Sequence, residues 1–116
     1  MIQEDKQLLL RDLCARLPYG VKFQGEDSNV YTLDAANYFV LQVEDVIFKP
    51  FLRPMSSMTE EEEEEYEMLQ TYPGFKTNHT DLTDMYDWLN KHHFDYRGLI
   101  PMDLALEALE DMYKIE

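Results

Sequence analysis

The first clear pattern in the chain is an apolar stripe near its start. Residues 3–17 contain neither Pro nor Gly. Apolar side chains recur there every three or four residues, at Leu9, Leu10, Leu13, Cys14 and Leu17. This spacing places them on one face of an α-helix. The pattern predicts an amphipathic helix over residues 3–17 with Cys14 in its core-facing side, ended by Pro18 and Gly20.

The period of the pattern then changes to that of β-strands. Val21 to Gln24 alternates apolar and polar residues, residues 25–28 have the composition of a turn, and Asn29 to Leu33 is rich in β-forming residues. Two such runs around a short polar turn predict an antiparallel hairpin.

A more apolar stretch follows a second turn, at residues 34–37. Tyr38 to Val43 is nearly all apolar or aromatic and predicts the most buried strand, with Val46 to Phe48 as its extension or as a short edge strand. Residues 49–54 include Pro50 and Pro54 and predict a connector that packs onto the domain, because a proline removes a donor from a strand ladder.

Helical signals dominate the second half. Thr59 and Glu62 have the spacing of a capping box, and the carboxylates that follow Thr59 favour the positive end of a helix dipole. The predicted helix has Tyr66 and Leu69 on its apolar edge and ends at Pro73 and Gly74.

Two further helices are predicted after this one. The first covers about residues 81–92, is capped by Thr80 or Asp81, and has an apolar side formed by Leu82, Met85, Tyr86 and Leu89. After a turn at residues 95–98, Pro101 suits the first turn of a short helix to about Leu109.

Together these elements predict one α+β domain. Its expected order is an N-terminal helix, a three- or four-stranded antiparallel sheet, then two or three C-terminal helices, with a single layer of helices on the sheet. A chain of 116 residues with 45% hydrophobic residues suits a single domain with one core. We expect no membrane span, since no run approaches about 18 apolar residues. The first residues lack the features of a secretory signal, so we expect a cytoplasmic protein.

Charge is the most unusual property of the composition. The net charge is −14. Residues 56–116 carry four Lys or Arg against sixteen Asp or Glu, net −12, whereas residues 1–55 carry six against eight, net −2. Such a surface repels phosphate backbones and anionic membranes, so we expect no direct binding of nucleic acid or membrane. The candidate docking surface for a basic protein is the run Glu60, Glu61, Glu62, Glu63, Glu64 and Glu65. Its alternative interpretation is the solvated face of a helix.

The histidines and nearby carboxylates suggest a second kind of site. The weak metal candidates are His92, His93, Asp95, Asp84 and Asp87. Adjacent histidines lie about 100° apart on a helix and can meet at one ion only if the helix ends there. The spacing matches no established metal motif, and the alternative is a pair of helix-end histidines that cap carbonyls or pack against neighbouring aromatic rings.

Other kinds of chemistry find little support. The chain has four glycines and no phosphate-binding loop, and Ser56 and Ser57 lie in no nucleophile elbow. Cys14 is the only cysteine, which excludes an intrachain disulfide. Residues 78–80 match a glycosylation sequence that has no meaning in a cytoplasmic protein. We therefore predict no catalytic residue and no cofactor.

Several longer phrases resemble one protein family. They are residues 12–21 (DLCARLPYGV), 49–62 (KPFLRPMSSMTEEE), 87–90 (DWLN) and 93–100 (HFDYRGLI). They resemble a family of short proteins from gut anaerobes of the Bacteroides group, often found in phage-like or mobile regions. The resemblance spans nearly the whole chain and implies a bacterial, cytoplasmic setting, but that family has no assigned activity, cofactor or site residues.

Three classes of function follow from these observations. The first is a non-enzymatic protein that binds a basic macromolecule through its acidic C-terminal half. A narrower form of it is an acidic DNA mimic that occupies a nucleic-acid-binding protein. The second is a metal-assisted hydrolase that uses His92, His93 and Asp95. The third is a structural subunit of an assembly, although the sequence does not define the oligomeric state.

Overall fold

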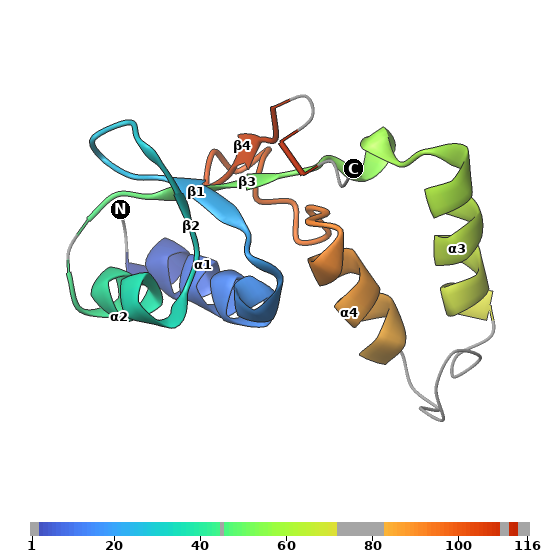
Figure 1. The fold of residues 1–116 in the computed structure, drawn as a ribbon, viewed down its shortest axis with the longest axis horizontal. Coiled ribbons are helices and arrows are strands. Elements are labelled where there is room, and N and C mark those ends of the chain that lie inside the picture. The colour runs from blue at the N-terminus through green and yellow to red at the C-terminus, as the bar shows by residue number, and fades with distance from the viewer. Residues whose placement is uncertain (1–2, 45, 72–82, 110–111, 114–116) are drawn as a thin grey trace.

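The leucine pattern near the start forms a helix as predicted. The computed structural model describes residues 3–44, 46–71, 83–109 and 112–113 (Figure 1). Helix α1 covers Gln3–Arg16, and a 3₁₀ turn at Leu17–Tyr19 ends at Gly20 in the left-handed region, with φ 66°. Glycine has no Cβ and adopts this conformation without strain, so the helix ends where the sequence predicted.

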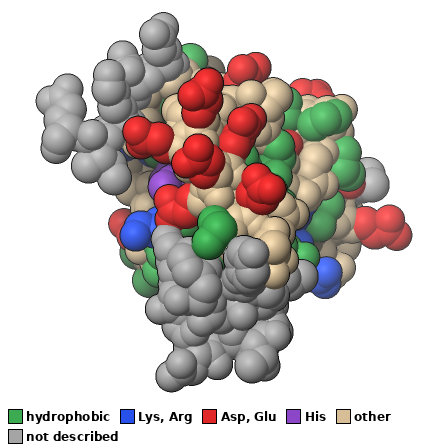
Figure 2. All heavy atoms as spheres, turned by 90° about the vertical axis from the view of Figure 1, so that its right-hand side faces the viewer, with side chains coloured by type: hydrophobic (Ala, Val, Ile, Leu, Met, Phe, Trp, Pro, Cys, Tyr) green, Lys and Arg blue, Asp and Glu red, His purple; other side chains and the backbone are tan. Residues whose placement is uncertain are grey.

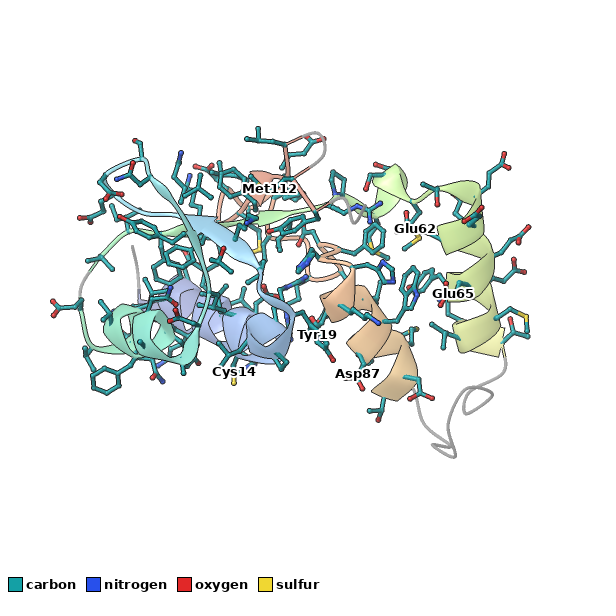
Figure 3. The ribbon with its side chains drawn as sticks, in the orientation of Figure 1. Cys14, Tyr19, Glu62, Glu65, Asp87 and Met112 are labelled. Carbon is teal, nitrogen blue, oxygen red and sulfur yellow. The ribbon has the colours of Figure 1, made fainter. Side chains whose placement is uncertain are left out.

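The predicted leucines lie on the buried side of α1, but Cys14 does not. Leu9 and Leu13 are fully buried, but the positions that share their face are Asp12 and Arg16. Cys14 is exposed, and its side chain points away from the sheet (Figure 3). The prediction that Cys14 belongs to the core is therefore wrong, because an ion pair occupies the inner stripe and turns the cysteine outward.

We expect the thiol of native Cys14 to react with a thiol-specific reagent at nearly the rate of the unfolded chain, because no burial protects it. Absorbance during modification, with and without denaturant, measures both rates. Protection of the native thiol would contradict its placement.

The predicted hairpin is confirmed. Strands β1 (Lys22–Gln24) and β2 (Val30–Thr32) pair antiparallel, with Phe23 opposite Tyr31. The turn between them closes through a hydrogen bond from the Ser28 N–H to the Gly25 carbonyl.

The predicted buried strand at Tyr38–Val43 is instead helix α2 (Ala35–Val43). Asp34 caps it: its carboxylate accepts from the Asn37 N–H at 2.8 Å, and the Asn37 side chain accepts from the Asp34 N–H at 2.8 Å. A short apolar run fits a strand or a helix equally well, and here the reciprocal cap decides for the helix. Only Leu41 of this helix is fully buried.

The prediction of a connector at residues 49–54 is also wrong. Strand β3 (Lys49–Leu52) lies in the middle of the sheet, whose order is β2-β1-β3-β4. Pro50 stands opposite Phe23, and pairing with β4 begins only at Phe51. A proline can stand there because alternate residues of an antiparallel strand direct their N–H away from the partner strand.

The C-terminal part contributes the last strand of the sheet. Residues 101–109 contain turns and strand β4 (Leu106–Glu107) instead of the predicted short helix. Strand β4 runs parallel to β3, so the sheet is mixed and not purely antiparallel. Val46 to Phe48 form neither the predicted extension nor an edge strand. The fold is nevertheless the predicted α+β class, with an N-terminal helix, a four-stranded sheet and further helices.

Helices α3 (Glu60–Thr71) and α4 (Thr83–Lys91) pack side by side next to the sheet, with α3 at one end of the molecule (Figure 1). A short 3₁₀ turn at Met55–Ser57 leads from β3 to α3. Three predicted features lie outside the described residues: the end of α3 at Pro73 and Gly74, the cap at Thr80 or Asp81, and the glycosylation sequence at 78–80.

Among the residues that are described, no helix combines the length and apolar character needed to cross a bilayer.

The buried apolar residues form two clusters instead of the single predicted core. The sheet core lies between the sheet and helices α1 and α2 and includes Leu9, Phe23 and Leu41. The helix-pair core lies between α3 and α4 and consists of Leu69, Met85, Trp88, Leu89 and Phe94.

A buried ionic group joins the two clusters. Arg16 donates to both oxygens of Asp12, at 2.9 and 3.2 Å, and to the Phe94 carbonyl at 2.7 Å. Both side chains are 0% exposed. Arg97 also donates to Asp12, at 3.0 Å. The group thereby ties α1 to the segment that follows α4, and so holds the helix pair against the sheet.

Candidate functional site

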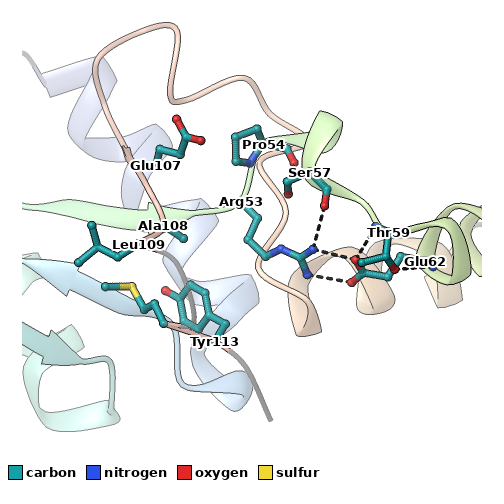
Figure 4. Close-up of a pocket in the computed structure, with 10 residues that line it drawn as sticks. Arg53, Pro54, Ser57, Thr59, Glu62, Glu107, Ala108, Leu109 and Tyr113 are labelled. Carbon is teal, nitrogen blue, oxygen red and sulfur yellow. Dashed lines mark hydrogen bonds and ion pairs between the residues drawn. The ribbon is translucent and has the colours of Figure 1, made fainter. Parts of the chain in front are cut away.

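The base of α3 is fixed by Arg53, the residue that follows β3. Its guanidinium donates to Glu62 Oε2 at 2.8 Å and to Oε1 at 2.7 Å, and its central carbon lies 4.2 Å from the centre of the Phe94 ring. The Arg53 backbone donates to the His93 carbonyl at 2.7 Å and accepts from the Asp95 N–H at 2.8 Å. Arg53 therefore connects the sheet, the start of α3 and the end of α4 at one point, which we call the Arg53 clamp (Figure 4).

Glu62 serves two purposes in this clamp. Besides its two bonds with Arg53, it completes the predicted capping box: its Oε1 accepts from the Thr59 N–H at 3.0 Å, and its own N–H donates to Thr59 Oγ1 at 3.2 Å. The bonds from Arg53, more than any other contact, lower the pKa of Glu62 from 4.5 to about 2. Bidentate guanidinium–carboxylate pairs are among the strongest hydrogen bonds of side chains. The Glu62 carboxylate is thus a structural group.

The clamp has a consequence for stability at low pH. Because the folded-state pKa of Glu62 is depressed, its stabilising contribution is present above the usual value of 4.5 and is lost as the pH falls toward about 2. We expect Glu62→Gln to flatten the loss of unfolding free energy between pH 5 and 2, and Arg53→Met to move the pKa of Glu62 back toward 4.5. Chemical denaturation at several pH values and NMR of the side-chain carboxyl measure these changes. Glu61→Gln, an exposed neighbour, is the control and should leave both quantities unchanged.

A pocket of about 510 Å³ opens beside the clamp and is lined by the segment that follows β3, the start of α3, and β4 with the residues after it (Figure 4). Its strongest polar groups already have partners. Arg53 is neutralised by Glu62, and the Tyr113 hydroxyl lies between two strands, where it accepts from the Lys22 N–H at 2.8 Å and donates to the Phe51 carbonyl at 2.6 Å. Burial raises the pKa of Tyr113 to about 12, so this hydroxyl stays protonated. The remaining charged group of the described lining is the Glu107 carboxylate, which is exposed to solvent.

The two histidines of the metal hypothesis have different surroundings. The His92 ring packs on Trp88, 4.5 Å between ring centres, and its Nδ1 lies 3.5 Å from Glu62 Oε2. The His93 ring is buried and stacks on Tyr113 at 3.9 Å. Burial lowers the pKa of both histidines, to about 4 for His93, so both are neutral at pH 7.

The end of α4 explains why His93 takes its position. Its φ is 64°, in the left-handed region, and the Phe94 N–H donates to the Leu89 carbonyl while the His93 N–H donates to that of Asn90. These bonds form a Schellman motif, which normally has glycine at the left-handed position. Leu89 and Phe94 also meet in the helix-pair core.

The carboxylates of the metal hypothesis lie elsewhere. Asp95 is buried and accepts from the backbone N–H groups of Leu99 and Ile100, at 2.8 and 2.9 Å. Asp87 is exposed on α4 (Figure 3), and Asp84 belongs to its first turn. In the described part of the chain, no group of three or more His, Cys, Asp or Glu side chains is placed to hold a metal ion. The structure does not bring the five candidates together.

The six-glutamate run divides into two sides of α3. Glu62 and Glu65 lie on the side that faces α4 (Figure 3), and both are partly buried. The remaining glutamates, together with one acid further along the helix, are exposed: Glu60, Glu61, Glu63, Glu64 and Glu67. We call these five residues the acidic stripe. Acidic side chains gather on this face of the molecule (Figure 2).

The carboxylates of the acidic stripe have no side-chain or backbone partners in the part of the chain that the structure describes. Met68, 41% exposed, lies on the same outward face, two turns after Glu61. The helix is held from its inner side by Leu69 and the Arg53 clamp, and the outer carboxylates add no contact to it beyond the interaction of the first-turn acids with the helix dipole.

Sequence reasoning missed the residues that hold this site. The Asp12 and Arg16 pair has the i, i+4 spacing of a helical ion pair, a signal that was available. No local signal links Arg53 to Glu62, because the sequence analysis places Arg53 in a connector at residues 49–54 and Glu62 in a helix cap, and their contact depends on how the two segments pack.

The comparisons with known proteins identify no relative. No family model, curated protein or solved structure matches the chain.

Proposed function

We propose that this protein is a non-enzymatic binding protein of the cytoplasm that docks a basic protein partner on the acidic stripe of α3. The partner is a protein surface rich in Lys and Arg. Nucleic acid and anionic membrane are poor partners, because the net charge of −14 repels both.

One observation carries the proposal. Five exposed carboxylates share the outer side of one helix, and none is paired with another described residue, while Glu62 of the same run is consumed by the Arg53 clamp. Glu62, which caps and holds the helix, has hydrogen-bond partners, whereas the carboxylates of the acidic stripe have none among the described residues. Unpaired charges of one sign attract an oppositely charged protein, raise its rate of association and discriminate against acidic competitors.

The position of the stripe also suits docking. Helix α3 is the outermost element at its end of the molecule (Figure 1), so a partner reaches it without contact with the sheet. The clamp and Leu69 fix the helix at its base and in its second half, so little conformational entropy is lost on binding. Met68 adds an apolar contact within the charged face.

A paired-variant capture experiment tests the proposal. The stripe variant carries Glu61→Gln, Glu63→Gln, Glu64→Gln and Glu67→Gln. The control variant carries Glu4→Gln, Glu44→Gln, Asp87→Asn and Glu107→Gln, which removes the same amount of charge from exposed positions outside the stripe.

Tagged wild type and both variants are incubated with lysate of the source organism at low and high salt, and the retained proteins are identified by mass spectrometry. We expect a basic protein that the wild type and the control retain at low salt and that the stripe variant loses. Equal retention by all three chains would contradict the proposal. Addition of DNA then shows whether the partner is itself a nucleic-acid-binding protein, as the mimicry hypothesis requires.

A further inference from the structure

Helix α2 is apolar on two sides, although the sheet core covers only one of them. On its inner side Leu41 is buried, and the Tyr38 hydroxyl donates to the Leu10 carbonyl at 3.1 Å. On its outer side Phe39 is 62% exposed, Val40 47% and Val43 60%. Helices that are apolar all round are normally buried on all sides. The outer side of α2 therefore has the composition of an interface.

The outer residues form a continuous stripe. Ala36, Phe39, Val40 and Val43 stand at i, i+3, i+4 and i+7, which is one face of a helix. We call these four residues the α2 stripe. Contiguous exposed apolar patches of this kind often mark protein–protein contacts.

Charge indicates which protein covers the stripe. Residues 35–43 contain no Asp, Glu, Lys or Arg, although the whole chain has a net charge of −14. The acids Asp34 and Glu44 flank the helix, and the Lys6 ammonium donates to the Glu44 carbonyl at 2.7 Å. Two copies of so acidic a chain repel each other over most orientations, but they can approach through an uncharged helix.

The shape of the molecule strengthens this argument. Helix α2 lies at one end and α3 at the opposite end of the longest dimension, which is 42 Å (Figure 1). When two copies meet through α2, their acidic stripes point away from each other. The distance between the acidic stripes of the two copies then exceeds the Debye length of about 8 Å at physiological salt, so the repulsion between them is screened.

We propose that the α2 stripe is the contact surface of a homodimer, in which the two α2 helices pack antiparallel about a twofold axis between Phe39 and Val40. This axis places Phe39 of one copy against Val40 of the partner subunit, and Ala36 against Val43 of the partner subunit. A twofold contact must be self-complementary, and here the small Ala36 faces the larger valine. Antiparallel helices also align their dipoles favourably.

The dimer is expected to be weak. Four side chains on one short helix cover an area at the low end of protein interfaces, for which a dissociation constant of about 1 μM or weaker is appropriate. This surface is separate from the acidic stripe, so the dimer can present two stripes to one extended partner or to two partners.

Sedimentation velocity over a range of concentrations tests the dimer. We expect the wild type to shift from monomer to dimer as its concentration rises. Phe39→Glu should remain monomeric at concentrations at least tenfold above the wild-type midpoint, since it places like charges at the twofold axis. Met102→Glu, at another exposed apolar residue (50% exposed), is the matched control and should dimerise as the wild type does. A monomeric wild type at all concentrations, or a dimeric Phe39→Glu variant, would overturn the proposal.

Disulfide cross-linking tests the pairing and does not depend on the charge variant. In a Cys14→Ser background, the pair Ala36→Cys and Val43→Cys should form an intermolecular disulfide dimer under mild oxidation. The single change Gln42→Cys, on an exposed residue next to the stripe, should cross-link much more slowly in the same background. Equal rates for the two variants would rule out the antiparallel arrangement.

Discussion

Replacing Asp12 with alanine is expected to lower the free energy of unfolding by about 3–5 kcal/mol, the usual cost of leaving one member of a buried ion pair without its partner. Arg16 is 0% exposed, and once the carboxylate is removed its charge would be opposed only by neutral groups among the described residues, the Phe94 carbonyl and the Tyr96 ring at 5.3 Å. Its Nη1 already lacks a hydrogen-bond partner in the described structure. Since small domains are stable by only about 5–15 kcal/mol, the variant should be partly unfolded at 37 °C.

Urea denaturation followed by circular dichroism measures this effect. Glu4→Ala, at an exposed acid on the same helix, is the control and should cost about 1 kcal/mol or less. The double change Asp12→Ala with Arg16→Met removes both buried charges and should be more stable than Asp12→Ala alone. A loss below about 1 kcal/mol for Asp12→Ala would show that the ionic group does not hold the two clusters together.

The second large effect concerns binding. Neutralising Glu61, Glu63, Glu64 and Glu67 should weaken the complex with the basic partner by about 1.4–2.8 kcal/mol, a factor of about 10–100, because each exposed charge contributes up to about 1 kcal/mol. The same four changes should alter the stability of the fold little, since none of these carboxylates has a described partner and the relief of their mutual repulsion offsets the lost dipole interaction of Glu61 and Glu63. Calorimetric titration measures the binding, and thermal unfolding the stability. A stripe variant that binds less because it has unfolded would be recognised by its melting curve.

Local signals predicted the elements whose causes are local. The capping box at Thr59 and Glu62 starts α3, and the hairpin at residues 22–32 needs only β-forming runs and a polar turn. The leucine spacing predicted α1 and its buried leucines, but not Asp12 and Arg16 beside them, because charged residues are almost never fully buried unless they are paired, as these two are.

The errors have two causes: a local helix cap that was overlooked at α2, and tertiary contacts that decide β3 and the clamp. The apolar run at Tyr38–Val43 fits a strand or a helix, and the pair Asp34 and Asn37 selects the helix. Strand β3 contains a proline and is stabilised by pairing with a strand more than 50 residues further along the chain. The clamp between Arg53 and Glu62 exists only once β3 and α3 are placed, so no pattern of spacing could reveal it.

The sequence predicted the acidic run as a candidate surface, and the structure corrects which of its residues are exposed. The acidic run was identified from the sequence, but only the structure separates Glu62 and Glu65, which face α4, from the exposed acids of the acidic stripe. The structure does not bring the two histidines of the metal hypothesis together. At the end of α4 the adjacent side chains have different neighbours, because His92 packs on Trp88 and His93 stacks on Tyr113.

The most direct test of the central claim is the affinity of the purified protein for its captured basic partner, measured as a function of salt for the wild type, the stripe variant and the control variant. We expect the affinity of the wild type and of the control to fall steeply as salt rises, and the stripe variant to bind weakly with a much flatter dependence. If the stripe variant retains the wild-type affinity and the wild-type dependence on salt, the acidic stripe of α3 is not the docking surface, and the exposed carboxylates are only a solvated helix face.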